Sequence, residues 1–358
     1  MFEMIYPIGD EMLTIKMILY PQKGGYMSYL YVCEQGAVIG VEANRFQVKY
    51  KDGLMKSVPA ETLEMIEIFG KVQLTTQCMT ECLKRGVNVI FYSSNGAYFG
   101  RLVSTNHVKV ERQRKQADLT EEFKTTIAKN IINAKIRNQT VILRRYARNQ
   151  KESVEKTITE MTYLSRKIEQ CSDTEQIMGY EGFAAREYFA ALGKLINPEF
   201  QFDKRTRRPP TDPFNSMISL GYSIILNEIY GKLEGKGLNP YFGVLHKDRE
   251  KHPTLASDLM EEWRAVLIDS VVMSMLNGHE LELEDFYRDE ESPAVFLGKT
   301  GFKTYINKLE KKFHTDNKYL SYINYSVSFR QALDLQVNQL CNAIENNEPE
   351  LYRAVVIR

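Results

Sequence analysis

A histidine and three acidic residues stand close together in the chain and have the chemistry of a metal site. His246 leads through a charged loop into a helical pattern whose opening turns carry Asp258, Glu261 and Glu262. The spacing i, i+3 and i+4 places these acids on one face of a regular α-helix. Carboxylate oxygens with one imidazole nitrogen suit Mg²⁺ or Mn²⁺. The alternative is a solvated acidic face, which a helix N-terminus favours by roughly 0.3 to 1 kcal/mol per charge.

A fourth acid, Glu181, lies at the centre of the apolar stripe of a helix predicted over 174–195. Burial of an isolated carboxylate is unfavourable by several kcal/mol, so Glu181 must be protonated, pair with a cation or bind a metal. From this helix alone, pairing with an arginine and ligation of a metal both remain open. His246 and the acidic face are the other residues that would complete a metal site.

Two groups of basic residues have the spacing expected of a polyanion-binding surface. Between Arg101 and Gln150 the chain has twelve Lys and Arg against four Asp and Glu, although its overall net charge is only +1. A stripe along the helix predicted over 120–149 and a loop with two prolines supply these candidates: Lys129, Arg137, Arg144, Arg145, Arg148, Lys204, Arg205, Arg207 and Arg208. Both groups are compatible with contacts to DNA phosphates and with a merely solvated surface.

Composition and missing motifs narrow the class of protein. The chain has 358 residues, 43% of them hydrophobic, and no apolar run approaches the ~20 residues of a membrane span. No signal peptide is recognisable, and five cysteines without a CxxC pair fit a reducing compartment, so we expect a cytoplasmic protein. A phosphate-binding loop, GxSxG and HExxH are all absent. A metal with basic surfaces therefore favours phosphodiester chemistry.

The elements that would position these residues predict an α+β protein. Strand patterns and one short helix over 75–86 indicate a small, β-sandwich-like domain over 27–104, preceded by an extension or extra strand over 1–26. We expect a linker over 105–119 and an all-α domain over 120–358. Its helices are predicted over 120–149, 151–170, 174–195, 213–234, 255–277, 300–313 and 327–346.

From Met27 to its C-terminus the chain resembles the CRISPR-associated spacer-acquisition integrases, the large subunit of the adaptation complex. The resemblance rests on the number and order of these motifs: LYVCEQGAVIG, IFGKVQLTTQ, CLKRGVNVIF, SSNGAYFGRLV, AKIRNQTVILRR, GYEGFAAREYF, PFNSMISLGYSIILNEI, GVLH and DLMEEWR. It implies a dimerising N-terminal β domain and a helical catalytic domain with one metal. It also implies a homodimer that joins a small ferredoxin-like partner protein and inserts new double-stranded DNA into a repeat array.

The resemblance also implies roles for individual residues. The family's metal-binding glutamate matches Glu181 and its histidine matches His246. The third ligand is aligned with Glu261, and Asp258 is the acidic neighbour one turn earlier, although Asp258, Glu261 and Glu262 all remain candidates. The N-x6-Y pattern of the preceding helix adds two site neighbours, Asn215 and Tyr222.

Three functions follow as hypotheses. The first is a metal-dependent DNA integrase and endonuclease, in which a DNA 3′-hydroxyl attacks a repeat phosphodiester. The second is a DNA-binding assembly module without chemistry of its own. The third is a stand-alone metal nuclease for branched or repair DNA, which would share the site and differ in its partner and product.

Overall fold

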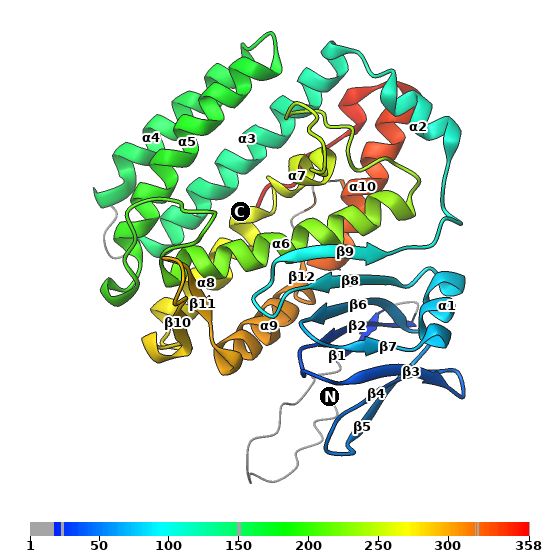
Figure 1. Ribbon diagram of the computed structural model, residues 1–358. Coiled ribbons are helices and arrows are strands. Elements are labelled where there is room, and N and C mark those ends of the chain that lie inside the picture. The colour runs from blue at the N-terminus through cyan, green and yellow to red at the C-terminus, as the bar shows by residue number, and fades with distance from the viewer. Residues whose placement is uncertain (1–17, 23–24, 149–151, 319, 321, 358) are drawn as a thin grey trace. The chain divides into compact units, whose positions relative to one another are not determined.

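The computed structural model describes residues 18–22, 25–148, 152–318, 320 and 322–357. The chain forms two compact units, Met1–Ser104 and Thr105–Arg358, referred to below as the β unit and the helical unit (Figure 1). N-terminal strands followed by a helical region make a mixed α+β protein, as the sequence predicts.

The β unit contains a five-stranded sheet in the order β1-β2-β6-β8-β9. Its central strand β6 is parallel to β2 and β8, whereas β1 and β9 pair antiparallel at the two edges. Residues on both faces of β6 are buried, as in a strand covered on two sides. The strands are β1 (Ile18–Gln22), β2 (Gly25–Val32), β6 (Leu63–Phe69), β8 (Asn88–Tyr92) and β9 (Tyr98–Leu102).

A second sheet of the β unit has the order β5-β4-β3-β7. Its strands are β3 (Val38–Glu42), β4 (Arg45–Lys49), β5 (Met55–Pro59) and β7 (Gln73–Leu74). One hydrophobic core includes residues of both sheets and of the helix α1 (Thr76–Arg85), whose Cys78 and Cys82 are fully buried. α1 begins after the Thr75 cap and ends at Gly86, whose φ of 72° suits a glycine.

The N-terminal extension is described only in part. β1 is an additional strand that pairs with β2, within the range for which the sequence allowed an extension or an extra strand. Residues 1–17 lie outside the described residues.

The helices of the helical unit begin and end within a few residues of their predicted bounds in most cases. A long helix α3 packs against α4 and α5, which also pack against each other (Figure 1). The principal helices are α2 (Val110–Ala117), α3 (Glu121–Tyr146), α4 (Glu152–Glu169), α5 (Thr174–Leu195), α6 (Pro213–Gly235), α9 (Lys299–Phe313) and α10 (Phe329–Asn346).

The prediction of one continuous helix over 255–277 is wrong, because the structure divides this segment into three parts. α7 (Thr254–Met260) ends at Glu261, a π-helix occupies Arg264–Asp269, and α8 (Ser270–Asn277) follows. Single-turn π segments are frequent at functional sites. The altered helical pitch means that an ideal α-helical wheel does not describe where Glu261 and Glu262 point.

Two further expectations for this part of the chain need correction. Residues 105–119 are not simply a linker, since α2 lies within them and packs against α10 in the helical unit. The helical unit is also not entirely helical. Two short antiparallel ribbons join its helices, formed by β10 (Phe286–Arg288) with β11 (Val295–Leu297) and by β12 (Asp316–Asn317) with β13 (Val327–Ser328).

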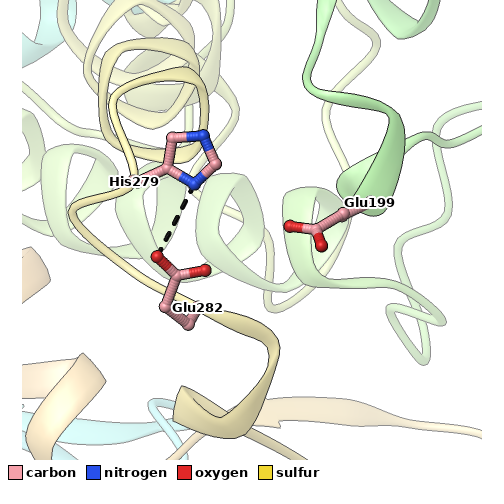
Figure 2. Close-up of side chains that lie close together, drawn as sticks. All are labelled: Glu199, His279 and Glu282. Atoms are coloured by element: carbon pink, nitrogen blue, oxygen red, sulfur yellow. Dashed lines mark ion pairs between the residues drawn. The ribbon is translucent and has the colours of Figure 1, made fainter.

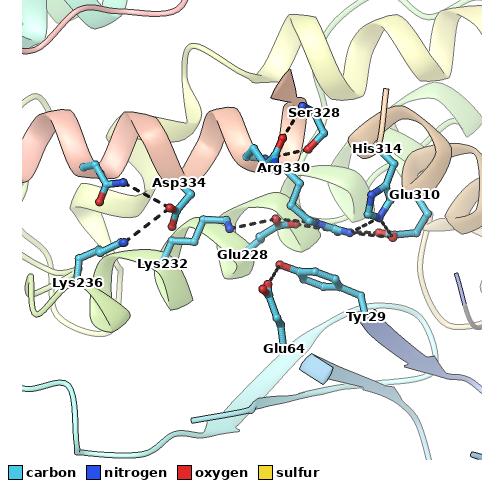
Figure 3. Close-up of polar contacts among 12 residues, drawn as sticks. Tyr29, Glu64, Glu228, Lys232, Lys236, Glu310, His314, Ser328, Arg330 and Asp334 are labelled. Atoms are coloured by element: carbon cyan, nitrogen blue, oxygen red, sulfur yellow. Dashed lines mark hydrogen bonds and ion pairs between the residues drawn. The ribbon is translucent and has the colours of Figure 1, made fainter. Parts of the chain in front are cut away.

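A buried ionic network links three helices of this unit (Figure 3). Arg330 of α10 donates to Glu228 of α6 over 2.9 Å and 3.1 Å, and to Glu310 of α9 over 2.9 Å and 2.8 Å. All three side chains are at most 2% exposed. Removal of one member would leave a buried charge uncompensated, which is strongly unfavourable.

None of the helices in the described part of the chain has the length and apolarity needed to cross a membrane.

Candidate functional site

Asp258 of α7 holds the loop that carries His246. Its carboxylate accepts the backbone N–H groups of Val244 over 2.8 Å, of Leu245 over 2.9 Å and of His246 over 3.3 Å. The same carboxylate lies 2.6 Å from Nδ1 of the His246 ring. With Nδ1 bound to Asp258, the other ring nitrogen, Nε2, is the one left for a ligand or a substrate.

The loop before His246 is too tight for a side chain at Gly243. A Cβ there would lie 3.0 Å from an Asp258 carboxylate oxygen and 2.9 Å from the His246 carbonyl oxygen. The nearby His252 has a different environment, because its Nε2 lies 3.1 Å from the Ser257 hydroxyl. His246 is therefore the histidine of this loop that faces carboxylates.

Burial alone would lower the pKa of His246. The hydrogen bond to Asp258 and the charges of Asp258, Glu261 and Glu181 outweigh it, so the pKa is raised above its usual value. The charges of Glu261 and Glu181 thus act on the imidazole together with that of its direct partner Asp258.

Glu181 of α5 and Glu261, at the end of α7, converge on one lysine. The ammonium of Lys135, on α3, forms an ion pair with Glu181 and another with Glu261 over 2.7 Å. The side chains of Lys135 and Glu261 are 7% and 6% exposed, and that of Glu181 is 15% exposed. The alternative in which a cation neutralises Glu181 is therefore realised in this structure, by a lysine rather than an arginine.

Arg264 is a second cation beside Glu261. Its Nε lies 3.0 Å from Glu261 Oε2, and its guanidinium lies over the Tyr222 ring, 4.6 Å from the centroid. Burial would raise the pKa of Glu261, but Arg264 and Lys135 hold it well below its usual value. Glu261 is therefore an ionised carboxylate in the interior, available as an oxygen ligand.

Tyr222 and Asn215, the two expected site neighbours on α6, have different roles. The Tyr222 hydroxyl donates to Asp269 of the π-helix, and the guanidinium of Arg205 lies 5.6 Å from the centroid of its ring. Asn215 accepts from Arg205 over 2.9 Å and donates to the Lys204 carbonyl over 2.9 Å. Asn215 thus fixes the basic loop, while Tyr222 packs between that loop and the site.

Glu262 does not belong to the group, contrary to its expected place as a site neighbour. It is fully buried and accepts hydrogen bonds from the Tyr352 hydroxyl and, over 2.7 Å, from the Val355 backbone N–H. Burial raises the pKa of Glu262 to about 7. Because α7 ends at Glu261, the next residue points toward the C-terminal segment instead of toward His246.

The predicted basic residues are mostly at the surface. Arg137, Arg144, Arg145 and Arg148 on or just after α3, and Lys204, Arg207 and Arg208 in the loop before α6, are exposed. Two candidates are engaged elsewhere: Lys129 donates to the Glu169 carbonyl over 3.1 Å, and Arg205 is partly buried beside Tyr222. The exposed members are accessible from solvent.

A separate group of ligand-type side chains lies on the surface of the helical unit (Figure 2). Glu199, His279 and Glu282 each offer one atom within 4.8 Å of the others, and the described residues contain no other acid and histidine group this compact. His279 and Glu282 are 60% and 51% exposed. Glu181, His246 and Glu261 are therefore more widely separated than this surface group, with Lys135 lying between the two acids.

Lys135 and Arg264 are site residues that the sequence patterns did not single out. Lys135 lies in the run Ile131–Ile136, whose residues are all buried. A charged residue in an apolar helical stripe is the signal that identified Glu181, and the same criterion applied to α3 would have identified Lys135. Arg264 follows Glu261 at i+3, a spacing that favours an ion pair.

The residues present fit a divalent cation. Glu181, Glu261 and His246 offer two oxygens and one nitrogen from α5, the end of α7 and the preceding loop. Hard divalent ions accept this mixture of donors. The carboxylates already share a positive group, the Lys135 ammonium, so the site is built for a cation.

Known proteins resemble this chain over most of its length. Residues 30–311 match the family model described as CRISPR associated protein Cas1. A CRISPR-associated endonuclease Cas1 of Mycobacterium tuberculosis is 33% identical over 325 residues, which are 90% of this chain and 96% of the relative.

Two solved structures are similar in fold. A chain of a Cas6-RT-Cas1–Cas2 complex has a TM-score of 0.81 and 25% identity, covering 94% of this chain and 37% of that one. A casposase bound to its integration product has a TM-score of 0.79 and 22% identity, covering 89% and 91%. With a family model matched over most of its length and a relative aligned almost from end to end, this chain belongs to the CRISPR-associated Cas1 family.

Proposed function

We propose that this endonuclease and integrase of CRISPR adaptation uses Glu181, His246 and Glu261 to hold one divalent cation, Mg²⁺ or Mn²⁺, and joins DNA by strand transfer. The observation that carries the proposal is the convergence of Glu181 and Glu261 on one buried positive group, with the His246 ring held through Nδ1 by Asp258, on the helix that ends beside Glu261. When bound, the ion would neutralise charge on the scissile phosphate.

In the proposed reaction the 3′-hydroxyl oxygen of the incoming DNA attacks a phosphorus atom of the repeat. A new phosphodiester bond forms, the bond from this phosphorus to the former 3′-oxygen of the repeat strand breaks, and that oxygen leaves as a 3′-hydroxyl after taking up a proton, which balances the proton lost by the attacking hydroxyl. Asp258 contributes by fixing the His246 ring through Nδ1, and Arg264 by keeping Glu261 ionised. Attack by water at the same phosphate gives the endonuclease reaction.

The exposed arginines and lysines provide the grip on DNA in this proposal. Arg137, Arg144, Arg145 and Arg148 lie on or just after α3, which also carries Lys135, and a second cluster precedes α6. Contacts to phosphates position DNA without reading its sequence. The choice of integration site must then come from DNA shape or from partners.

The test is strand transfer on a labelled repeat substrate with Mg²⁺ or Mn²⁺ and the partner protein. We expect Glu181→Gln to reduce the rate at least about a hundredfold, because an amide is a poor replacement for an ionic ligand. The matched control is Glu187→Gln on the same helix, which alters a partly exposed residue. Wild-type activity in Glu181→Gln would exclude the assigned site.

The dimerising β domain, the homodimer and the small ferredoxin-like partner protein are also part of the proposal. The edge strand β9 supports an interface in the β unit, because it carries Phe99 with 72% of its surface exposed. The solved complex that includes Cas1 and Cas2 supports assembly with a second protein. Copurification of a small partner would distinguish this assembly from a stand-alone nuclease.

A further inference from the structure

Lys135 is an unusual residue to find in the interior. It is 6% exposed, on the buried side of α3, and a lone ammonium in such a position would lose much of its hydration energy. Its ammonium is instead paired with Glu181 and Glu261, the two carboxylates that the proposed function assigns to the metal.

The positions of the two carboxylates also depend on Lys135. Glu181 comes from α5 and Glu261 from the end of α7, and both contact the same ammonium. Without a positive group between them, two anionic side chains buried this close together would repel each other. Lys135 thus does what a bound cation would do: it neutralises the pair and keeps both side chains directed inward.

The Lys135 ammonium and a bound divalent ion would compete for the carboxylate oxygens of Glu181 and Glu261. Glu261 Oε2 lies 2.7 Å from the Lys135 ammonium and 3.0 Å from Arg264 Nε, so a divalent ion that binds this oxygen would meet positive groups already beside it. A divalent ion shared by Glu181 and Glu261 would lie close to the ammonium that both carboxylates contact, and the two positive charges would repel each other. Metal binding therefore requires that the ammonium leave the space between the acids.

Resting on the proposed metal site, we propose that Lys135 is a built-in counter-ion of Glu181 and Glu261, and that the divalent cation enters by displacing it. In the metal-free protein the lysine keeps the acids paired. In the metal-bound protein the ammonium moves off the carboxylates, so ion binding and lysine release are one exchange.

The test is the affinity for Mn²⁺, measured from the electron paramagnetic resonance signal of the free ion, in Lys135→Met and in the wild type. Methionine fills a similar volume without a charge. Because unit charges this close interact strongly even at an effective dielectric constant of about 20, removal of the competing ammonium should tighten Mn²⁺ binding at least about tenfold. The rise in Tm on adding Mn²⁺ should also be larger in the variant.

The sign of the change separates this role from a purely structural one. A lysine that only supports the site would weaken Mn²⁺ binding when removed, and an uninvolved lysine would leave it unchanged, so either result overturns the proposal. Lys308→Met is the matched control, because it removes a lysine from an ion pair with Glu280 on the surface and should not alter Mn²⁺ affinity. Circular dichroism and gel filtration check folding, and Lys135→Gln replaces Lys135→Met if the latter does not fold.

Glu181→Gln in the same assay separates the metal site from the exchange mechanism. If it leaves Mn²⁺ binding as in the wild type, the site assignment itself fails. If Glu181→Gln weakens Mn²⁺ binding but neither Lys135 variant tightens it, the proposed metal site stands and the exchange mechanism is wrong.

Discussion

Asp258 shows how one residue serves the site without facing the substrate. Its carboxylate binds three successive backbone N–H groups and the ring of His246, so it sets both the course of the loop and the orientation of the imidazole. Partners of this kind typically contribute a factor of about 10 to 100 in metal affinity.

We therefore expect Asp258→Asn to fold but to bind Mn²⁺ about 10 to 100 times more weakly, because asparagine orients and polarises His246 less well. Calorimetric titration measures the change. Asp248→Asn is the matched control, since Asp248 lies in the same loop and accepts the Gly243 N–H over 2.8 Å, away from the His246 ring. Equal affinities in the two variants would show that Asp258 does not act through His246.

A second residue-scale prediction concerns Asp269, which accepts hydrogen bonds from Tyr222 and Tyr188 in a fully buried position. Burial raises the pKa of Asp269 from 3.8 to about 6, even though both tyrosines oppose the shift. The folded state then binds the proton more tightly than the unfolded state. The contribution of Asp269 to stability is thus fully present below pH 3.8 and is lost as the pH rises toward 6.

Asp269→Asn removes this titration, so its stability relative to the wild type should increase between about pH 4 and pH 6 by up to about 3 kcal/mol. Denaturant unfolding at several pH values within this interval measures the difference. Asp203→Asn, which alters an exposed carboxylate, is the control. A constant difference between Asp269→Asn and the wild type would contradict the raised pKa.

At the scale of elements, α3 is the common support of the site and of the C-terminal segment. Lys135 contacts the acids of the site, and one turn further on Asn138 donates to the carbonyls of Glu262 and Val355, each over 2.9 Å. Asn138 also accepts the Ile357 N–H over 2.9 Å. Asn138 thereby connects the C-terminal segment to the backbone that follows α7.

Asn138→Ala should lower the free energy of unfolding by about 2 to 4 kcal/mol, because it leaves several buried backbone groups without partners. Thermal or denaturant unfolding gives the measurement. The control is Asn130→Ala on the same helix, where the side chain makes a weaker contact of 3.4 Å with the Tyr352 carbonyl. Similar losses of stability in the two variants would show that the C-terminal segment is not held through Asn138.

At the scale of the whole molecule, the net charge of +1 conceals an uneven distribution. The exposed Arg144, Arg145 and Arg148 concentrate positive charge at the end of α3. Their replacement together by alanine should weaken DNA binding for all sequences alike. In a plot of the logarithm of the DNA-binding constant against the logarithm of the salt concentration, the negative slope should become shallower by about 3. This is roughly 0.9 for each phosphate that is no longer neutralised.

Fluorescence anisotropy with a labelled duplex at several salt concentrations measures this slope. A triple variant that replaces the exposed Lys51, Lys84 and Lys311 removes the same charge elsewhere and should leave the slope nearly unchanged. Equal slopes in the two triple variants would mean that the three arginines at the end of α3 contribute no more to DNA binding than lysines elsewhere on the surface.

The proposed homodimer gives the second prediction at this scale. Phe99→Asp places a charge on the exposed edge strand β9 and should convert a dimer to a monomer in sedimentation velocity, since a buried unpaired charge is strongly unfavourable. Tyr163→Asp changes another exposed aromatic residue, on α4, and should leave the mass unchanged. A dimer that persists in Phe99→Asp would exclude β9 from the interface.

The mixed fold, the bounds of most helices and the unusual position of Glu181 could all be predicted from the amino-acid sequence. These features follow from hydrophobic periodicity and from residues that start and end helices, and both depend on neighbours in the chain. A glutamate among apolar residues already requires a proton or a cation, whatever the tertiary structure. The resemblance of the motifs then indicated the family to which the chain belongs.

Which partner each of the three acids contacts, in contrast, depends on tertiary packing. An ideal helix places Asp258, Glu261 and Glu262 on one face, but the end of α7 and the following π-helix direct them to the His246 loop, to Lys135 and to Val355, respectively. Each partner comes from a distant segment, so its approach is set by how the elements pack. Local periodicity contains no information about such contacts, and for this reason the lysine between the two acids is visible only in the folded chain.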